Sequence, residues 1–75
     1  MTNSSFAAQV GCHHTMASRL RNGKRLPSLS MFATICETFD LDTDDALSAY
    51  KQGPDAFGAF LRATVFSRIP SAAAT

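Results

Sequence analysis

The sequence predicts an all-α fold, a small helical bundle of about five short helices in a single domain. Three observations carry this prediction. Apolar residues recur in several segments at the three- and four-residue spacing of a helix face. Glycine, Asn-Gly and Gly-Pro interrupt these segments at short intervals, as they do at helix ends. No segment supports a strand to the same degree, and 75 residues leave room for one small domain only.

The first expected helix is barely two turns long. Asn3, Ser4 or Ser5 is expected to cap its start, and Phe6 belongs to its apolar face. Gly11 is expected to end it, because glycine adopts the left-handed conformation of a helix end without steric cost.

A second helix is expected from about His14 to Arg21. Ala17 and Leu20 lie three residues apart and face inward, which leaves a polar and basic outer face. Asn22-Gly23 ends the helix. The next helix begins at the capping residue Ser28. Its spacing predicts one buried stripe, formed by Leu29, Phe32, Cys36 and Phe39.

Two further helices complete the bundle. Asp42, with Asp45 three residues later, imitates a capping box and begins a fourth helix that Gly53-Pro54 ends. A fifth helix is expected from Asp55 to about Phe66. We therefore expect one domain over residues 1–69, with 55–69 as an extra C-terminal helix. The small residues of 70–75 form an expected flexible tail.

The formal net charge of +1 hides an uneven distribution. Residues 1–36 contain four basic residues and no acid, and all four lie between positions 19 and 25. Residues 37–55 contain six acids and one lysine, a local charge of −5. A polyanion could therefore meet one face of the domain only.

Other classes of protein find little support. No apolar run exceeds three residues, whereas a membrane span needs roughly twenty, so we expect a cytoplasmic protein. Cys12 and Cys36 are too sparse for a disulfide framework, and with His13 and His14 they lack the paired spacing of zinc ligands. We expect no catalytic residues, no metal, no cofactor and no small-molecule ligand.

The ordered motifs resemble the lambda-repressor-like (Cro-type, XRE) helix-turn-helix family over about residues 3–47. The matching elements are Ala7 and Gly11, then Arg21-Asn22-Gly23-Lys24-Arg25, then Pro27-Ser28-Leu29. Phe39-Asp40-Leu41-Asp42 stands where the family usually has a Leu-Gly-Val-Ser-like turn. The resemblance implies a DNA-binding domain that places its second helix in the major groove.

The resemblance also implies roles for individual residues. His14, Thr15 and Arg19 would face base edges, with Ser18 as a secondary candidate, and the guanidinium of Arg19 suits guanine best. Asn3, Asn22, Lys24 and Arg25 match positions that touch phosphates. Arg21, from the same basic segment, completes the set of candidate DNA-binding residues.

The chain departs from the family pattern at both ends. The family usually has a full helix before the helix-turn-helix, where this chain has only Met1 to Ser4. The segment 55–69 could fold into the vacant space or pair with a second copy of the chain. In the second case a homodimer would form through Phe57, Phe60, Leu61 and Val65.

The function that the resemblance implies is a transcriptional regulator, a Cro-like or immunity repressor of the bacteriophage type, whose partner is double-stranded operator DNA. The alternative is an antitoxin-like or accessory protein-interaction subunit with weak DNA contact, whose C-terminal helical segment holds another protein. No sequence feature supports an enzyme.

Overall fold

The computed structural model describes residues 1–68, so the expected tail at 70–75 and the expected domain end at 69 lie outside the described residues. All regular structure in residues 1–68 is helical, as predicted. The five helices are α1 (Asn3–Val10), α2 (His14–Arg21), α3 (Leu29–Phe39), α4 (Thr43–Gln52) and α5 (Pro54–Thr64).

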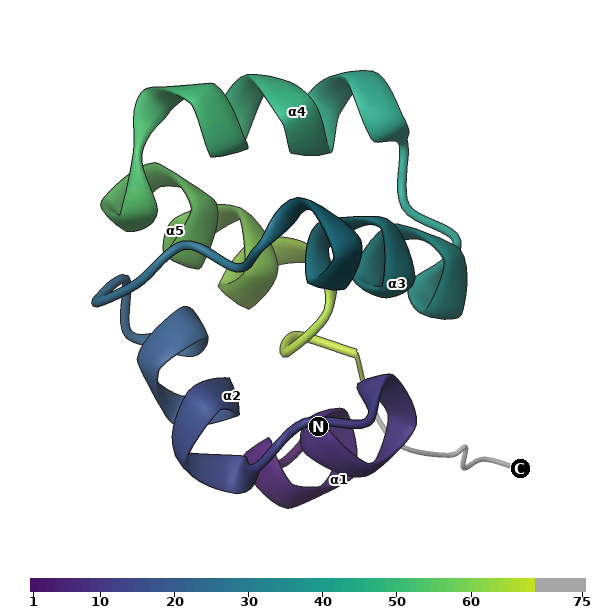
Figure 1. Cartoon of the computed structure of the whole chain (residues 1–75). Helices are drawn as coiled ribbons and strands as arrows, with labels where there is room; N and C mark the ends of the chain where they lie inside the picture. The colour runs from purple at the N-terminus through teal and green to yellow at the C-terminus, as the bar shows by residue number, and fades with distance from the viewer. Residues whose placement is uncertain (69–75) are drawn as a thin grey trace.

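The helices form a small bundle in which α5 lies at the centre (Figure 1). It packs against α4 on one side and α2 on the other. The short helices α1 and α2 pack on each other, and α1 also meets α3. An extended loop leads from α2 to α3 across the bundle (Figure 1). None of the helices in the described part of the chain has the length and apolar character of a membrane span.

Side-chain caps at two helix starts follow the sequence signals closely. Ser28 accepts the Met31 N–H at 3.2 Å, and Asp42 accepts the Asp45 N–H at 3.1 Å, as predicted. The first helix begins differently, because Thr2 is its cap and accepts the Ser5 N–H at 3.0 Å. Asn3, expected among the capping residues, is instead the first residue of α1.

Left-handed residues end three of the helices. Gly11 (φ 76°) ends α1 as predicted, and Gly23 (φ 71°) follows α2. After Gly23, the Lys24 N–H reaches the Arg19 carbonyl at 2.9 Å, which is the long hydrogen bond of a Schellman motif. Asp40 plays the same part after α3 with φ 53°, a conformation that is costly for residues other than glycine.

The core is built around aromatic stacking. The ring of Phe6, which is fully buried, stacks on Phe39 at a centroid distance of 5.4 Å and on Phe66 at 5.0 Å. These contacts join α1 to α3 and to the turn after α5. A second cluster places Phe57 against Phe32 and Tyr50, which joins α5 to α3 and α4.

The C-terminal helical segment folds into the chain's own core. Phe57, Leu61 and Val65 are fully buried, and Phe60 is half-buried. Of the four side chains expected to meet a second copy, only Phe60 therefore keeps exposed surface. The helix itself ends at Thr64, earlier than expected, and Val65 lies in the turn that follows.

One expected core residue is at the surface. Leu29 is 69% exposed, so its predicted place in the buried stripe of α3 is wrong. It is the first residue of α3. The stripe is correct from Phe32 onward, since Phe32, Cys36 and Phe39 are buried.

Two glycines bring the backbone of α5 close to the turn after α2. A Cβ added to Gly58 in α5 would lie 2.7 Å from both the Cα and the nitrogen of Gly23. It would also lie 3.1 Å from the carbonyl oxygen of Leu20 in α2. The backbone of α5 thus touches the turn at the end of α2 directly.

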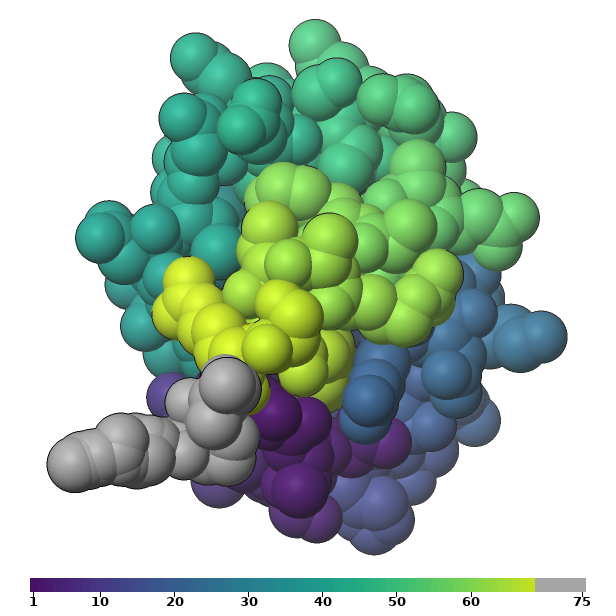
Figure 2. Space-filling model, turned by 180° about the vertical axis from the view of Figure 1, so that it is seen from behind, coloured from purple at the N-terminus to yellow at the C-terminus, as the bar shows by residue number. Residues whose placement is uncertain are grey.

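The two ends of the described chain meet behind the bundle. Figure 2 shows the purple N-terminal residues beside the yellow segment that follows α5. The amino group of Met1 donates to the carbonyl oxygens of Arg68 at 3.2 Å and Phe66 at 3.5 Å. This contact joins the start of the described chain to the turn after α5.

Gly58→Ala is expected to destabilise the protein, although alanine is the better helix former. Propensity alone would add about 1 kcal/mol of stability. The new Cβ would press on the Gly23 backbone, which cannot rotate away, and such overpacking costs about 1–3 kcal/mol. Denaturant unfolding measures the difference. Ala59→Gly, at an exposed position next along α5, is the propensity control. Unchanged or higher stability in Gly58→Ala contradicts the close contact.

Asp40→Gly is expected to stabilise the protein by about 0.5 kcal/mol, because glycine adopts the left-handed conformation without a Cβ clash. Asp40→Ala should lower the free energy of unfolding, since alanine lacks the local hydrogen bonding that lets aspartate tolerate this conformation. Thermal unfolding of the two variants beside the unmodified chain tests this, and the reverse order would refute it.

Candidate nucleic-acid interface

The helix α2 is held by its inner face and capped at its start. Ala17 and Leu20 are fully buried, and α2 packs against α1 and α5. The ring nitrogen Nδ1 of His13 accepts the Thr15 N–H at 3.1 Å, which satisfies one of the free N–H groups of the first turn. The imidazole rings of His13 and His14 lie 4.3 Å apart at the same end.

The outer face of α2 carries only polar side chains. At 100° per residue they cover an arc of about 140° on the side away from the core. The side chains on this outer face are His14, Thr15, Ser18, Arg19 and Asn22. Four of them are exposed and Ser18 is half-buried. The Ser18 hydroxyl accepts a hydrogen bond from the Asn22 amide at 3.3 Å, so these two side chains restrain each other.

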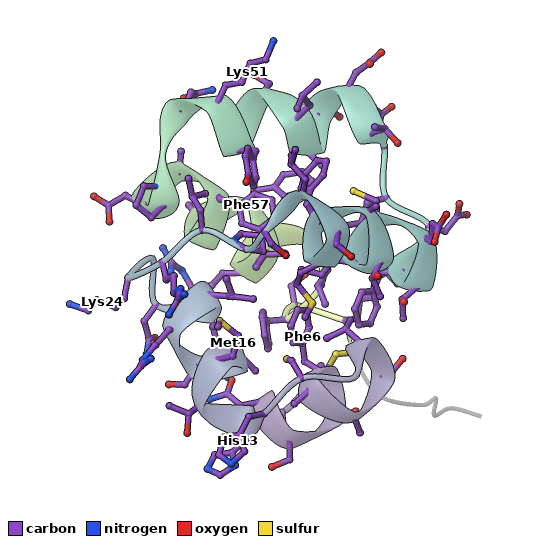
Figure 3. All side chains as sticks on the ribbon, in the orientation of Figure 1. Phe6, His13, Met16, Lys24, Lys51 and Phe57 are labelled. Atoms are coloured by element: carbon purple, nitrogen blue, oxygen red, sulfur yellow. The ribbon has the colours of Figure 1, made fainter. Side chains whose placement is uncertain are left out.

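The basic loop after α2 has a fixed path. The Schellman hydrogen bond joins the Lys24 N–H to the carbonyl of Arg19, five positions earlier in the chain. Lys24 and Arg25 are exposed, and further along the loop the hydroxyl of Tyr50 donates to the Pro27 carbonyl at 2.8 Å. Figure 3 shows Lys24 and His13 projecting outward near the two ends of α2. The backbone of the loop that carries Lys24 and Arg25 is therefore held next to the outer face of α2.

The charges separate in space as they do along the chain. Arg19, Lys24 and Arg25 are exposed on α2 and its loop. The acids Asp44 and Asp45 lie in the first turn of α4, at the other end of the bundle in Figure 1. Asp55 is the exception, since its backbone and carboxylate lie against Gly23. Apart from this carboxylate, the α2 side of the described chain is basic.

Two of the predicted residues are joined to each other. Arg21 donates from Nη1 to the Asn3 side-chain oxygen at 3.2 Å, and its guanidinium lies 4.7 Å from the centre of the Phe66 ring. Asn3 and Arg21 therefore link α1, α2 and the turn after α5. The other seven predicted residues lie together on the outer face of α2 and the basic loop.

Two arginines that sequence reasoning did not select make long-range contacts. Arg62 donates from Nη1 to the carbonyl oxygen of Arg21, the last residue of α2. Arg68 donates from Nη2 to the carbonyl of Phe39, the last residue of α3, at 2.7 Å. The partners are 41 and 29 residues apart, so no local spacing could have identified them.

The cysteines and histidines do not form a metal centre in the described residues. No three His, Cys, Asp or Glu side chains converge in residues 1–68. Both thiols are free, Cys36 buried and Cys12 half-buried. Burial raises the pKa of each thiol, and the neighbouring carboxylate of Glu37 raises the pKa of Cys36 further. Neither cysteine has the lowered pKa of a nucleophile.

The raised pKa of Cys36 predicts a loss of stability in alkali. The neutral thiol is favoured in the folded chain, so its contribution is complete below the unfolded pKa of about 8.5 and is lost as pH rises through the folded value. We expect the free energy of unfolding to fall less steeply between about pH 8 and pH 10 in Cys36→Ala than in the unmodified chain. Urea unfolding at several pH values gives the two slopes. If the free energy of unfolding falls equally steeply with pH in both chains, the Cys36 thiol is not the cause of the loss of stability.

Comparison with known proteins gives no family for this chain. No protein-family model, curated protein or solved structure matches it. The outer face of α2, the basic loop and the charges around them are the features of the chain that point to a function.

Proposed function

We propose that the protein is a sequence-specific double-stranded DNA-binding transcriptional regulator that occupies operator DNA with α2 in the major groove. The single observation that carries this proposal is the outer face of α2, whose polar side chains continue into a fixed basic loop. We further propose that it works as a repressor of the Cro or phage-immunity type in the cytoplasm of a bacterial host.

The dimensions of α2 suit this role. A helix about 10–12 Å across fits a major groove about 12 Å wide. Because α2 is anchored by its inner face and its C-terminal end, the outer face is free to meet base edges. Arg19 has the planar fork that pairs with guanine, and His14 and Thr15 would read neighbouring bases with less discrimination. Ser18, restrained by Asn22, is a secondary contact.

The phosphate contacts would come from the loop and the ends of the helices. Lys24 and Arg25 are exposed beside α2, where the DNA backbone would pass if the helix entered the groove. Asn22 would join them. Asn3 and Arg21 bond to each other, so any phosphate contact at this pair would use the remaining donors of the guanidinium.

Two copies are expected on one operator. A single short helix reads only a few base pairs, and operator affinity normally requires two recognition helices about 34 Å apart. The core position of Phe57, Leu61 and Val65 leaves Phe60 as the one residue of the expected dimer face with surface to offer. We therefore propose a homodimer formed on the DNA, with Phe60 at the edge of the contact.

The alternative, an antitoxin-like or accessory subunit, has less support. It needs the C-terminal helical segment to hold another protein. The apolar side chains of that segment are used inside the chain, where Phe57 and Leu61 are fully buried. Co-purification of a stoichiometric protein partner, together with no sequence-dependent DNA binding, would favour this alternative.

The proposal is tested by selecting bound duplexes from a random pool and measuring variants on the selected sequence. Arg19→Ala should cost about 1–3 kcal/mol and relax one base position. Lys24→Ala and Arg25→Ala should weaken binding to all sequences alike and lower the salt slope by about one. Lys51→Ala removes the same charge from α4, on the opposite side of the bundle (Figure 3), and should change little.

Two results would contradict the proposal. A pool that yields no enriched sequence excludes sequence-specific binding. Equal losses for Lys24→Ala and Lys51→Ala would mean that only net charge matters. A uniform loss from Arg19→Ala across operator variants would reassign Arg19 from base contact to phosphate contact.

A further inference from the structure

The C-terminal part of the chain carries two arginines in matched positions. Each donates to the carbonyl oxygen of the last residue of a helix, Arg62 to Arg21 in α2 and Arg68 to Phe39 in α3. The last carbonyls of a helix have no partner within the helix and form the negative end of its dipole. An arginine from elsewhere in the chain satisfies these carbonyls and attaches the helix end to a second element.

The attachment at α2 is reinforced by close backbone packing. Gly58 lies one helical turn before Arg62 on α5, and its backbone touches the Gly23 turn. The side chain of Arg21 is also held, by Asn3 and by the Phe66 ring. The C-terminal end of α2 is thus attached at its backbone through Arg62 and Gly58, and at its last side chain through α1 and the turn after α5.

This attachment lies between the proposed base contact and the proposed phosphate contact. Arg21 follows Arg19 and precedes Lys24, and the Lys24 N–H is bonded to the Arg19 carbonyl. A shift of the Arg21 carbonyl would therefore move both side chains relative to the rest of the bundle. Arg62 is exposed, but its hydrogen bond points back to the protein.

We propose that Arg62 is a positioning residue for DNA recognition: it fixes the C-terminal end of α2 on α5, and so sets where Arg19 and Lys24 meet the duplex. This inference rests on the proposed function. Arg62 acts through Arg21 and makes no base contact of its own. Arg68, which holds α3 in the same way, has no such effect because α3 lies outside the outer face of α2 and its loop.

The test compares Arg62→Ala, Arg62→Lys and Arg68→Ala with the unmodified chain. The two alanine variants lose the same charge and a hydrogen bond to the last carbonyl of a helix, so Arg68→Ala is the control. Arg68→Ala also loses a hydrogen bond to the Thr64 carbonyl and the contact of its guanidinium with the Phe39 ring. Dissociation constants are measured for the selected duplex and for a scrambled duplex of equal length, at several salt concentrations. Circular dichroism checks that each variant is folded.

We expect Arg62→Ala to lose about tenfold in affinity for the selected duplex, the equivalent of weakening one base contact. Its affinity for the scrambled duplex and its salt slope should match those of Arg68→Ala. Arg62→Lys keeps a charged donor and should recover most of the lost affinity. A loss of sequence preference without a matching loss of general affinity distinguishes positioning from charge.

A second measurement needs no DNA and keeps the proposal testable if affinities are low. Amide hydrogen exchange at Gly23 and Lys24 should be faster in Arg62→Ala than in the unmodified chain. In Arg68→Ala the exchange of these two amides should be unchanged, and that of Asp40 and Leu41 faster. Equal exchange of Gly23 and Lys24 in Arg62→Ala and the unmodified chain would overturn the attachment.

Three other results would overturn the inference, and they separate it from the proposed function. If Arg62→Ala lowers the salt slope by about one and weakens both duplexes equally, Arg62 is a phosphate contact. If Arg62→Ala and Arg68→Ala bind alike while the unmodified chain selects a sequence, only the positioning role fails. If the unmodified chain selects no sequence, the proposed function fails and the positioning role fails with it.

Discussion

The contact between Gly23 and Gly58 is the constraint on which the arrangement of the bundle depends. A Cβ on Gly58 would lie only 2.7 Å from the Gly23 backbone, and a Cβ on Gly23 would lie 3.1 Å from the Asp55 Cα. The contact lets α5 lie directly on the end of α2 and reach the interior with Phe57 and Leu61. Gly23 must also be left-handed, so its conformation and its small size are required at the same position.

Helix caps, helix ends and helix faces are predicted well from the sequence, because they depend on residues close together along the chain. The caps at Ser28 and Asp42, the end of α1 at Gly11 and the bounds of α2 all follow from signals within a few residues. The outer face of α2 is predictable for the same reason, because residues three and four apart share a side of the helix. Its base-reading role stays a prediction.

Features that depend on distant parts of the chain could not be predicted in this way. Spacing places Leu29 on the stripe of α3 but does not reveal that no other part of the described chain covers it there. The hydrogen bond between Arg21 and Asn3 joins residues 18 positions apart, so no local spacing predicts it. The sequence allows the 55–69 segment either to fold into the chain's own core or to pair with a second copy. The close contact between Gly58 and Gly23, which accompanies the first arrangement, follows from no sequence pattern.

The outer face of α2 contributes almost nothing to the core, so its side chains can be varied without disturbing the packing of the bundle. Four of its five side chains are exposed, and the helix is held by Ala17, Leu20 and the bonds at its last residue. Substitutions on that face would leave the hydrophobic packing intact, and surface changes of this kind typically alter stability by no more than about 0.5 kcal/mol. The chain is therefore a compact scaffold on which a combinatorial library of α2 faces could be displayed, each new surface inheriting the same fold.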